Sequence, residues 1–145
     1  MLFDTDIFIW VQRGNLKAAA SIEASKERCL SVQTYMELLQ CAKDKQQQRT
    51  IKRFIAELGF HVLPFTENIG HRALLYIEEY GLSSGMRAGD AIIAATATEN
   101  GFPLTTADAK HLRVVKDLDL RYLGLKPTYL PGNENGHPEP FALSP

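Results

Sequence analysis

The chain has 145 residues, of which 45% are hydrophobic and 23% are charged, as in ordinary globular proteins. This length suits one domain, and the composition excludes global disorder, a collagen-like fibre and a disulfide-stabilised miniprotein. Sixteen basic and seventeen acidic residues give a net charge of −1. That charge argues against a strongly basic protein that coats nucleic acid by charge alone.

Cysteine usage and apolar runs bear on the cellular location. Cys29 and Cys41 form neither a disulfide framework nor a CxxC metal motif, which favours two reduced thiols. The most apolar run, residues 91–97, is far shorter than the ~20 residues of a membrane span. The N-terminus lacks the basic and apolar regions of a signal peptide. We therefore predict a cytoplasmic protein without a membrane partner.

Short apolar runs alternate with longer amphipathic runs along the chain. In chain order, the pattern predicts a strand at 2–3, a helical run at 7–11, a strand at 29–32, helices at 34–42 and 46–58, a strand at 60–65, a helix at 67–80, a loop at 81–89, a buried helix at 90–100, and strands at 103–106 and 118–123. Strands that alternate with helices predict an α/β fold with a parallel sheet.

The last segment differs in composition from the rest. Residues 126–145 contain five of the seven prolines and few residues suited to a core. We predict a domain at residues 1–125, followed by a Pro/Gly-rich C-terminal tail at 126–145. Such a tail is extended or disordered unless a partner orders it.

Four acidic residues fall where ligands bind in parallel α/β sheets, at the carboxyl ends of strands. Asp4 follows the first strand, Glu37 lies early in the helix after the second, and Asp108 lies two residues beyond a later strand. Asp90 begins the buried helix that leads into that later strand. We therefore expect these carboxylates, from distant parts of the chain, to converge on one edge of the sheet.

Carboxylates held close together repel one another, so one takes up a proton unless a cation neutralises them. Oxygen ligands suit Mg²⁺ or Mn²⁺, whereas the four histidines show no zinc-ligand spacing. A carboxylate Mg²⁺ site suits phosphodiester chemistry, because the metal lowers the pKa of a bound water and offsets charge on the phosphate. One ion and two ions both agree with the sequence.

Each acid also has a structural interpretation. Asp4 fits turn chemistry, and Asp90 fits the N-cap of the apolar helix. Glu37 fits an exposed helix position, and Asp108 fits the cap of a short helix over 110–112. Only the joint pattern of the four acids favours a catalytic site.

Basic residues gather in one stretch, where only Asp44 opposes them: Lys43, Lys45, Arg49, Lys52 and Arg53. This stretch predicts a solvent-exposed helix face, with contact to an RNA backbone as the alternative. Arg87 and Lys110 flank two of the acids and either lie on the surface or hold a phosphate.

Four blocks of sequence occur in a recognisable order: LFDTDIFI at 2–9, YMELL at 35–39, RAGDAIIAATA at 87–97 and LTTAD at 104–108. Together they resemble a PIN-domain ribonuclease and, more narrowly, a VapC-type toxin of a type II toxin–antitoxin system. The resemblance covers about residues 1–124, and its most specific block is GDAIIAATA at 89–97. It does not extend to the tail.

The resemblance implies an α/β/α sandwich around a central parallel sheet and a Mg²⁺-dependent endoribonuclease, with Mn²⁺ as the alternative ion. The residues that match the family's catalytic set are Asp4, Glu37, Asp90, Asp108 and Thr106, of which the four acids match the metal ligands. Asp4 and Asp90 match the most direct ligands, and Thr106 matches a hydroxyl residue that orders the site. Asp6 stands where the family varies and takes at most a supporting role.

The resemblance also implies a substrate and partners. RNA is cleaved by in-line attack of a metal-activated water, which leaves a 3′-hydroxyl and a 5′-phosphate. Such toxins form homodimers and are neutralised by a small VapB-like antitoxin that blocks the acidic site. Binding to DNA then belongs to the complex with the antitoxin and not to this chain.

Two other classes of function share some of these residues. In a haloacid dehalogenase-like phosphatase, Asp4 is the nucleophile, Asp6 is the general acid and Ser31 binds phosphate. Against this class, Ala94 stands where a second acid would help, and no lysine has a matching place. In a non-catalytic RNA- or protein-binding module, the acids are structural.

Overall fold

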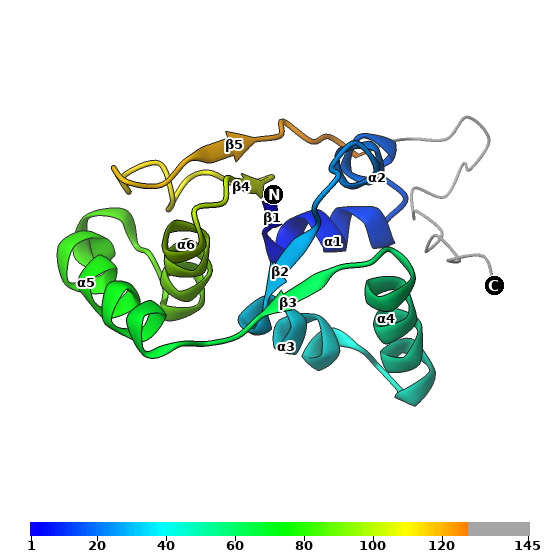
Figure 1. Cartoon of the computed structure of the whole chain (residues 1–145). Coiled ribbons are helices and arrows are strands. Elements are labelled where there is room, and N and C mark those ends of the chain that lie inside the picture. Colours follow the sequence, from blue (N-terminus) through cyan, green and yellow to red (C-terminus); the bar gives the residue numbers. More distant parts are fainter. Residues whose placement is uncertain (128–145) are drawn as a thin grey trace.

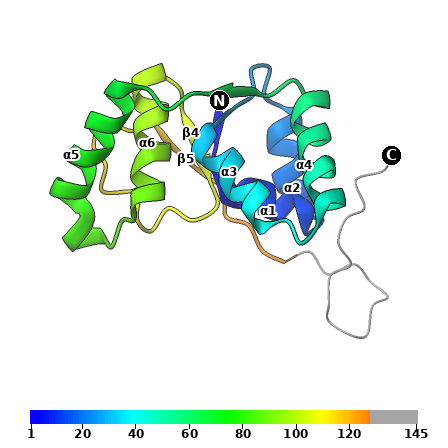
Figure 2. The same ribbon diagram turned by 90° about the horizontal axis from the view of Figure 1, so that it is seen from below.

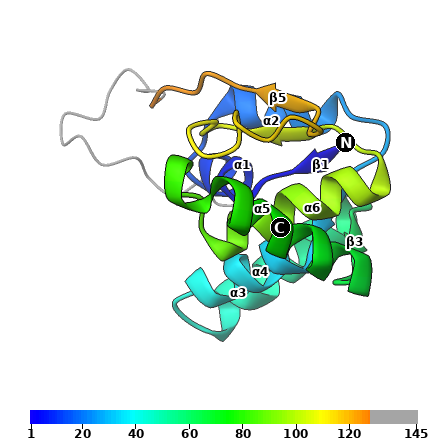
Figure 3. The ribbon, with the colours of Figure 1, turned by 90° about the vertical axis from the view of Figure 1, so that its left-hand side faces the viewer.

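The first strand of the chain, β1 (Leu2–Phe3), lies in the middle of a five-stranded sheet. In the computed structural model, which describes residues 1–127, the strand order is β3-β2-β1-β4-β5 and all neighbours are parallel. The other strands are β2 (Cys29–Ser31), β3 (His61–Leu63), β4 (Leu104–Thr106) and β5 (Leu120–Tyr122). Figure 3 shows β5 and β3 toward opposite margins of the sheet, with β1 between them. Because all strands are parallel, their carboxyl ends share one edge of the sheet.

Helices cover both faces of this sheet, so the predicted α/β/α sandwich is confirmed. They are α1 (Thr5–Gln12), α2 (Leu16–Glu23), α3 (Val32–Cys41), α4 (Lys45–Glu57), α5 (Glu67–Ser84) and α6 (Ala88–Asn100). In Figure 1, α5 and α6 lie on one side of the strands, and α1, α2 and α4 lie on the other. Figure 2 shows α3 between these two groups of helices, near the start of α1.

Two hydrophobic clusters hold the layers together, one on each face of the sheet. Successive side chains of a strand point to opposite faces, so Leu2 packs with α5 and α6 whereas Phe3 packs with α1, α2 and α4. The same division holds in β2, where Cys29 belongs to the first cluster and Leu30 to the second. All four side chains are buried. The central strands therefore anchor both layers and fix where their carboxyl ends lie.

Apart from shifts of one to three residues at the ends of elements, the structure differs from the sequence-based prediction at α2 and around the start of α6. Helix α2 was not predicted, although Asn15 caps it by accepting a hydrogen bond from the Ala18 N–H (2.9 Å). The predicted loop at 81–89 is also too long, because α5 continues to Ser84 and α6 begins at Ala88. The expectation that Asp90 begins its helix is therefore wrong by two residues, since it is the third residue of α6.

The described part of the chain ends close to the start of α2. The Lys126 carbonyl accepts a hydrogen bond from Asn15 Nδ2 (3.0 Å), and the Gly124 carbonyl accepts one from Lys17 Nζ (3.4 Å). The predicted tail at 126–145 lies outside the described residues, except for its first two. No helix in residues 1–127 is long and apolar enough to cross a membrane.

Candidate active site

The candidate site lies at the carboxyl ends of β1 and β4, near the point where the order of strands reverses. From β1, the chain continues to β2 on one side, whereas β4 pairs with β1 on the other. Ligands of open parallel α/β sheets bind at such a reversal. Asp4 is the first residue after β1, and its N–H donates to the Thr105 carbonyl of β4 (2.9 Å). The pairing of these strands therefore brings Asp4 beside the end of β4.

Thr106, the last residue of β4, joins two of the acids. Its side chain is fully buried, and its Oγ1 lies 2.9 Å from Asp4 Oδ2 and 3.2 Å from Asp6 Oδ2. The Ala107 N–H also donates to both carboxylate oxygens of Asp6 (3.2 and 3.1 Å). Asp6 thus ties the first turn of α1 to the end of β4. This contact gives Asp6 a larger structural part than the sequence suggested.

Glu37 reaches the same region from α3. The Thr5 hydroxyl donates to Glu37 Oε2 (2.7 Å), and the Gln33 amide donates to Glu37 Oε1 (2.9 Å). Thr5 directly follows Asp4, so this bond links Glu37 of α3 to the residue next to Asp4. Gly89 of α6 packs against the same group, because a Cβ atom there would lie 2.9 Å from Glu37 Oε1.

Asp90 approaches from the first turn of α6. Its Oδ2 accepts a hydrogen bond from the Arg87 N–H (3.2 Å), which satisfies a free donor at the helix N-terminus. Oδ1 accepts no hydrogen bond from residues 1–127. The negative charge of Asp90 is close enough to raise the pKa of the Asp4 carboxyl. Asp90 therefore both caps its helix and leaves one oxygen free for a ligand.

Asp108 lies at the margin of this group. Its backbone closes on Thr106, with the Thr106 hydroxyl 3.1 Å from the Asp108 carbonyl oxygen and 3.2 Å from the Asp108 nitrogen. The side chain is exposed, and its Oδ1 accepts a hydrogen bond from the Lys110 N–H (3.0 Å). Residues 110–112 form turns rather than the short helix considered from the sequence. The structure connects Asp108 to the other acids through its backbone and not through its carboxylate.

Burial and mutual repulsion alter the protonation of the central acids. The pKa of Asp4 rises from its ordinary value of 3.8 to about 7, mainly because burial penalises the charged form. Repulsion from Asp6 adds to this rise, and Asp90 adds less, while hydrogen bonds from Thr106 and the Thr5 N–H oppose it. The pKa of Asp6 is also raised, first of all by burial. A cation at this site would relieve the same repulsion.

The chemistry of these donors fits a divalent cation that prefers oxygen ligands. Asp4, Glu37 and Asp90 offer carboxylate oxygens of the kind that Mg²⁺ and Mn²⁺ bind. Within residues 1–127, however, no three His, Cys, Asp or Glu side chains are arranged so that they could hold a metal ion as they stand. Both oxygens of Glu37 already accept hydrogen bonds, so binding an ion requires the acids to shift.

The residues assigned to a phosphatase are engaged in structural contacts. Ser31 caps α3, with its hydroxyl accepting from the Thr34 N–H (3.0 Å) and lying 3.2 Å from Thr34 Oγ1. The Asp6 carboxylate accepts from the Ala107 N–H, as described above. These contacts give Ser31 and Asp6 structural roles and do not favour the roles that a haloacid dehalogenase-like phosphatase requires of them.

Three participants in the site were not anticipated from the sequence. Thr5 and Gln33 hold Glu37, and Gly89 leaves room for it. The four-residue spacing from Gln33 to Glu37 is a readable signal, because such residues are neighbours on a helix. The contact between Gly89 and Glu37 joins different helices, so local spacing does not reveal it.

The fold and the site define a class of proteins: parallel α/β proteins that bind a ligand at the carboxyl ends of their strands, where the strand order reverses. Comparison with known families identifies the class. The sequence profile of the PIN domain matches residues 1–117. The chain therefore belongs to the PIN domain family. A search of the curated proteins found no significant match.

Solved structures have the same fold. A chain of a toxin–antitoxin complex from Klebsiella pneumoniae superposes with a TM-score of 0.68 at 26% identity, covering 89% of this chain and 98% of that one. VapBC2 from Rickettsia felis, bound to a promoter DNA fragment, gives a TM-score of 0.70 at 17% identity, covering 84% of this chain and 97% of that one. VapBC-1 from nontypeable Haemophilus influenzae gives 0.70 at 20% identity, covering 83% and 96%.

Proposed function

We propose that this protein is a Mg²⁺-dependent endoribonuclease and the toxin of a type II toxin–antitoxin system of the VapBC kind. The observation that carries the proposal is the arrangement around Asp4: its carboxylate contacts Thr106, the charge of Asp90 helps to raise its pKa, and the adjoining Thr5 holds Glu37. PIN domains are generally nucleases. The structure from Klebsiella pneumoniae, at 26% identity, is a toxin–antitoxin complex and supports the toxin assignment.

In this proposal, Asp4 and Asp90 are the most direct ligands of the metal, and Glu37 and Asp108 complete the cluster. The metal supplies an activated water and neutralises charge on the scissile phosphate, with Mn²⁺ as the alternative ion. Thr106 holds the Asp4 carboxylate in place through its hydroxyl. The exposed side chains of Arg87 and Lys110 are available to attract the RNA backbone. In-line attack leaves a 3′-hydroxyl and a 5′-phosphate.

The partners are part of the same proposal. A VapB-like antitoxin neutralises the toxin by covering its acidic site, and DNA binding belongs to that complex. The active toxin is a homodimer. The antitoxin assignment draws support from the complexes that share this fold, including those from Klebsiella pneumoniae and Rickettsia felis.

The test is cleavage of total bacterial RNA by purified, antitoxin-free protein in Mg²⁺, with new 5′-phosphate ends mapped by sequencing. EDTA and Asp90→Asn should each abolish these ends, the substitution by on the order of 100-fold or more. Asparagine keeps an oxygen for the Arg87 N–H, so the helix cap and the fold should survive. The matched control is Asp44→Asn, which changes an exposed acid that caps α4.

Different results would contradict different parts of the proposal. An Asp90→Asn protein that cuts RNA at the normal rate would exclude the assigned site. If neither protein cuts RNA and both bind it equally, a non-catalytic binding module becomes the better assignment. Hydrolysis of small phosphate esters without RNA cleavage would indicate a phosphatase.

A further inference from the structure

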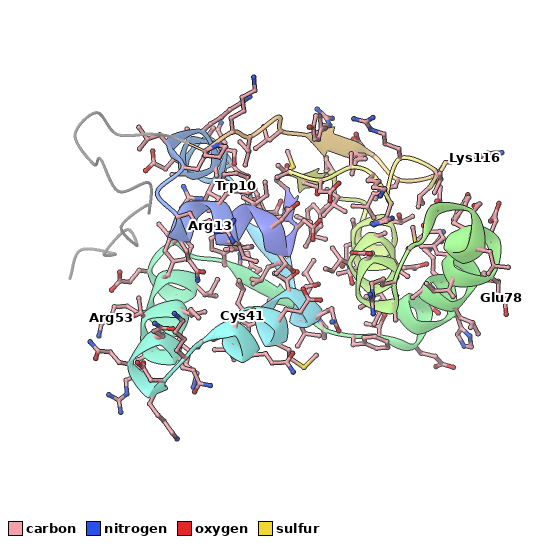
Figure 4. The ribbon with its side chains drawn as sticks, turned by 180° about the vertical axis from the view of Figure 1, so that it is seen from behind. Trp10, Arg13, Cys41, Arg53, Glu78 and Lys116 are labelled. Carbon is pink, nitrogen blue, oxygen red and sulfur yellow. The ribbon has the colours of Figure 1, made fainter. Side chains whose placement is uncertain are left out.

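A groove separate from the acidic site lies between α1, α3 and α4. The large apolar side chains that line it are Phe8, Val11, Leu38, Ile51, Phe54 and Ile55. Its volume is about 220 Å³, which accommodates a few apolar side chains rather than a whole cofactor. Cys41 also lines this groove and is exposed, whereas the other cysteine, Cys29, is buried. Figure 4 shows Cys41 on the side of the molecule that carries α4.

The surface beside the groove is strongly basic. Helix α4 carries four exposed cations, and none of them forms an ion pair with any of residues 1–127: Lys45, Arg49, Lys52 and Arg53. Figure 4 shows Arg53 on the outer side of α4. An occupant of the groove should therefore combine apolar side chains with negative charge.

The chain itself supplies such a segment. Residues 128–145 contain two glutamates, Glu134 and Glu139, and no lysine or arginine. Near their end stands the sequence Phe141-Ala142-Leu143. In an extended segment, residues two positions apart point to the same side, so Phe141 and Leu143 can enter one groove together. Apolar anchors and acidic flanks thus match the groove and its basic border.

The described part of the chain also ends near the groove. The Lys126 carbonyl accepts a hydrogen bond from Asn15, which directly precedes α2. Gln12, at the end of α1, lines the groove and lies three residues before Asn15. Phe141 lies fourteen residues after Pro127, and an extended chain spans about 3.3 Å per residue, or roughly 46 Å over this stretch. A segment of this length is therefore long enough to span from Pro127 to the groove.

We propose that residues 128–145 of this chain dock into the groove between α1, α3 and α4, with Phe141 and Leu143 as the apolar anchors. The glutamates of the segment then face the cations of α4. The docked segment covers Cys41 and packs on α3, the helix that also carries Glu37. This inference concerns a surface apart from the acidic site and does not depend on the proposed nuclease activity.

Cys41 provides the test, because docking should shield its thiol. The rate of alkylation by N-ethylmaleimide is measured at Cys41 and at Cys29 by peptide mass spectrometry, in the full-length chain. The double substitution Phe141→Ser and Leu143→Ser should raise the Cys41 rate severalfold and leave the Cys29 rate unchanged. Ser144→Ala, in the same segment, is the matched control and should leave the Cys41 rate unchanged.

A charge reversal tests the electrostatic part. Lys52→Glu on α4 should also raise the Cys41 rate, whereas Lys116→Glu should not. Lys116 is also an exposed lysine and lies on the opposite side of the molecule (Figure 4). The effect of Lys52→Glu should shrink at high salt, because ions screen exposed charges.

Three results would overturn the proposal. Equal Cys41 rates in the unmodified chain and in the double variant would show that the segment does not cover the groove. Protection that disappears on dilution would assign the groove to the segment of a second copy. Protection that persists in the double variant, together with a co-purified chain, would assign the groove to that partner.

Discussion

Asp4 is the residue whose charge depends most on the fold. Its pKa is about 7 in the folded protein and near 3.8 in the unfolded chain, so folding takes up a proton between these values. The stabilising effect of that proton is complete below the unfolded pKa and is lost as the pH rises through the folded one. Without metal, the free energy of unfolding should therefore fall between about pH 4 and 7.

Replacing Asp4 by asparagine, a neutral residue of the same shape, tests whether Asp4 causes this pH dependence of stability. Asp4→Asn should make most of that pH dependence disappear, as measured by urea unfolding in EDTA at several pH values. A smaller dependence of the unfolding free energy on pH should remain, because the pKa of Asp6 is raised as well. Asp108→Asn removes an exposed neighbouring acid and should leave the slope as it is. An unchanged slope in Asp4→Asn would show that other groups cause it.

Helix α6 supplies the acid Asp90 to the candidate site, and its Gly89 leaves room for the Glu37 side chain. A Cβ atom at Gly89 would lie 2.9 Å from Glu37 Oε1 and 3.4 Å from Gln33 Nε2. Both atoms end flexible side chains, so Gly89→Ala should move Glu37 rather than the backbone. We expect RNA cleavage to fall roughly 10- to 100-fold, while thermal stability is unchanged or slightly higher, since alanine favours a helix.

The chain offers a matched control for this substitution. Gly81 lies in α5, and a Cβ atom there meets only Ile77 Cγ2, at 3.5 Å, an ordinary contact. Gly81→Ala should therefore leave cleavage intact. If Gly89→Ala cleaves RNA as fast as the unmodified protein, the position of Glu37 does not matter for the reaction.

Most elements could be predicted from local signals in the sequence. Thr66 before α5 and Gly101 after α6 mark helix ends, and the structure confirms the cap and the left-handed glycine. The missed element, α2, is a short Ala-rich helix that buries only two residues, Ala18 and Ile22. The start of α6 was misplaced because Asp90 caps the helix from inside its first turn rather than from the N-cap.

The candidate site could be predicted in part, because the carboxyl ends of parallel strands must share one edge. That rule brings Asp4 beside β4 without any knowledge of side-chain contacts. It does not show which hydroxyl holds Glu37, nor that Asp108 turns its carboxylate to solvent. Those details depend on rotamers and on contacts between helices, which spacing along the chain does not encode.

The whole molecule is needed to bring the acids together, since Asp4, Glu37 and Asp90 come from segments far apart in sequence. The unfolded chain cannot hold them around one ion, so a metal that binds them stabilises only the folded state. At a Mg²⁺ concentration of about 100 Kd, the gain is roughly 2.7 kcal/mol. For a chain of this size, the melting temperature should rise by on the order of 5–10 °C.

Protons compete with the metal for the same carboxylates, so this rise should be larger at about pH 8 than at about pH 5. The measurement is thermal unfolding with added Mg²⁺, compared with NaCl at equal ionic strength. The double variant Asp4→Asn and Glu37→Gln should lose the rise while remaining folded. An equal rise in that variant would mean that Mg²⁺ binds elsewhere, and no rise in the unmodified protein would contradict the metal assignment. The pH dependence distinguishes ion binding at the raised-pKa acids from a general effect of salt, because screening does not require these groups to lose protons.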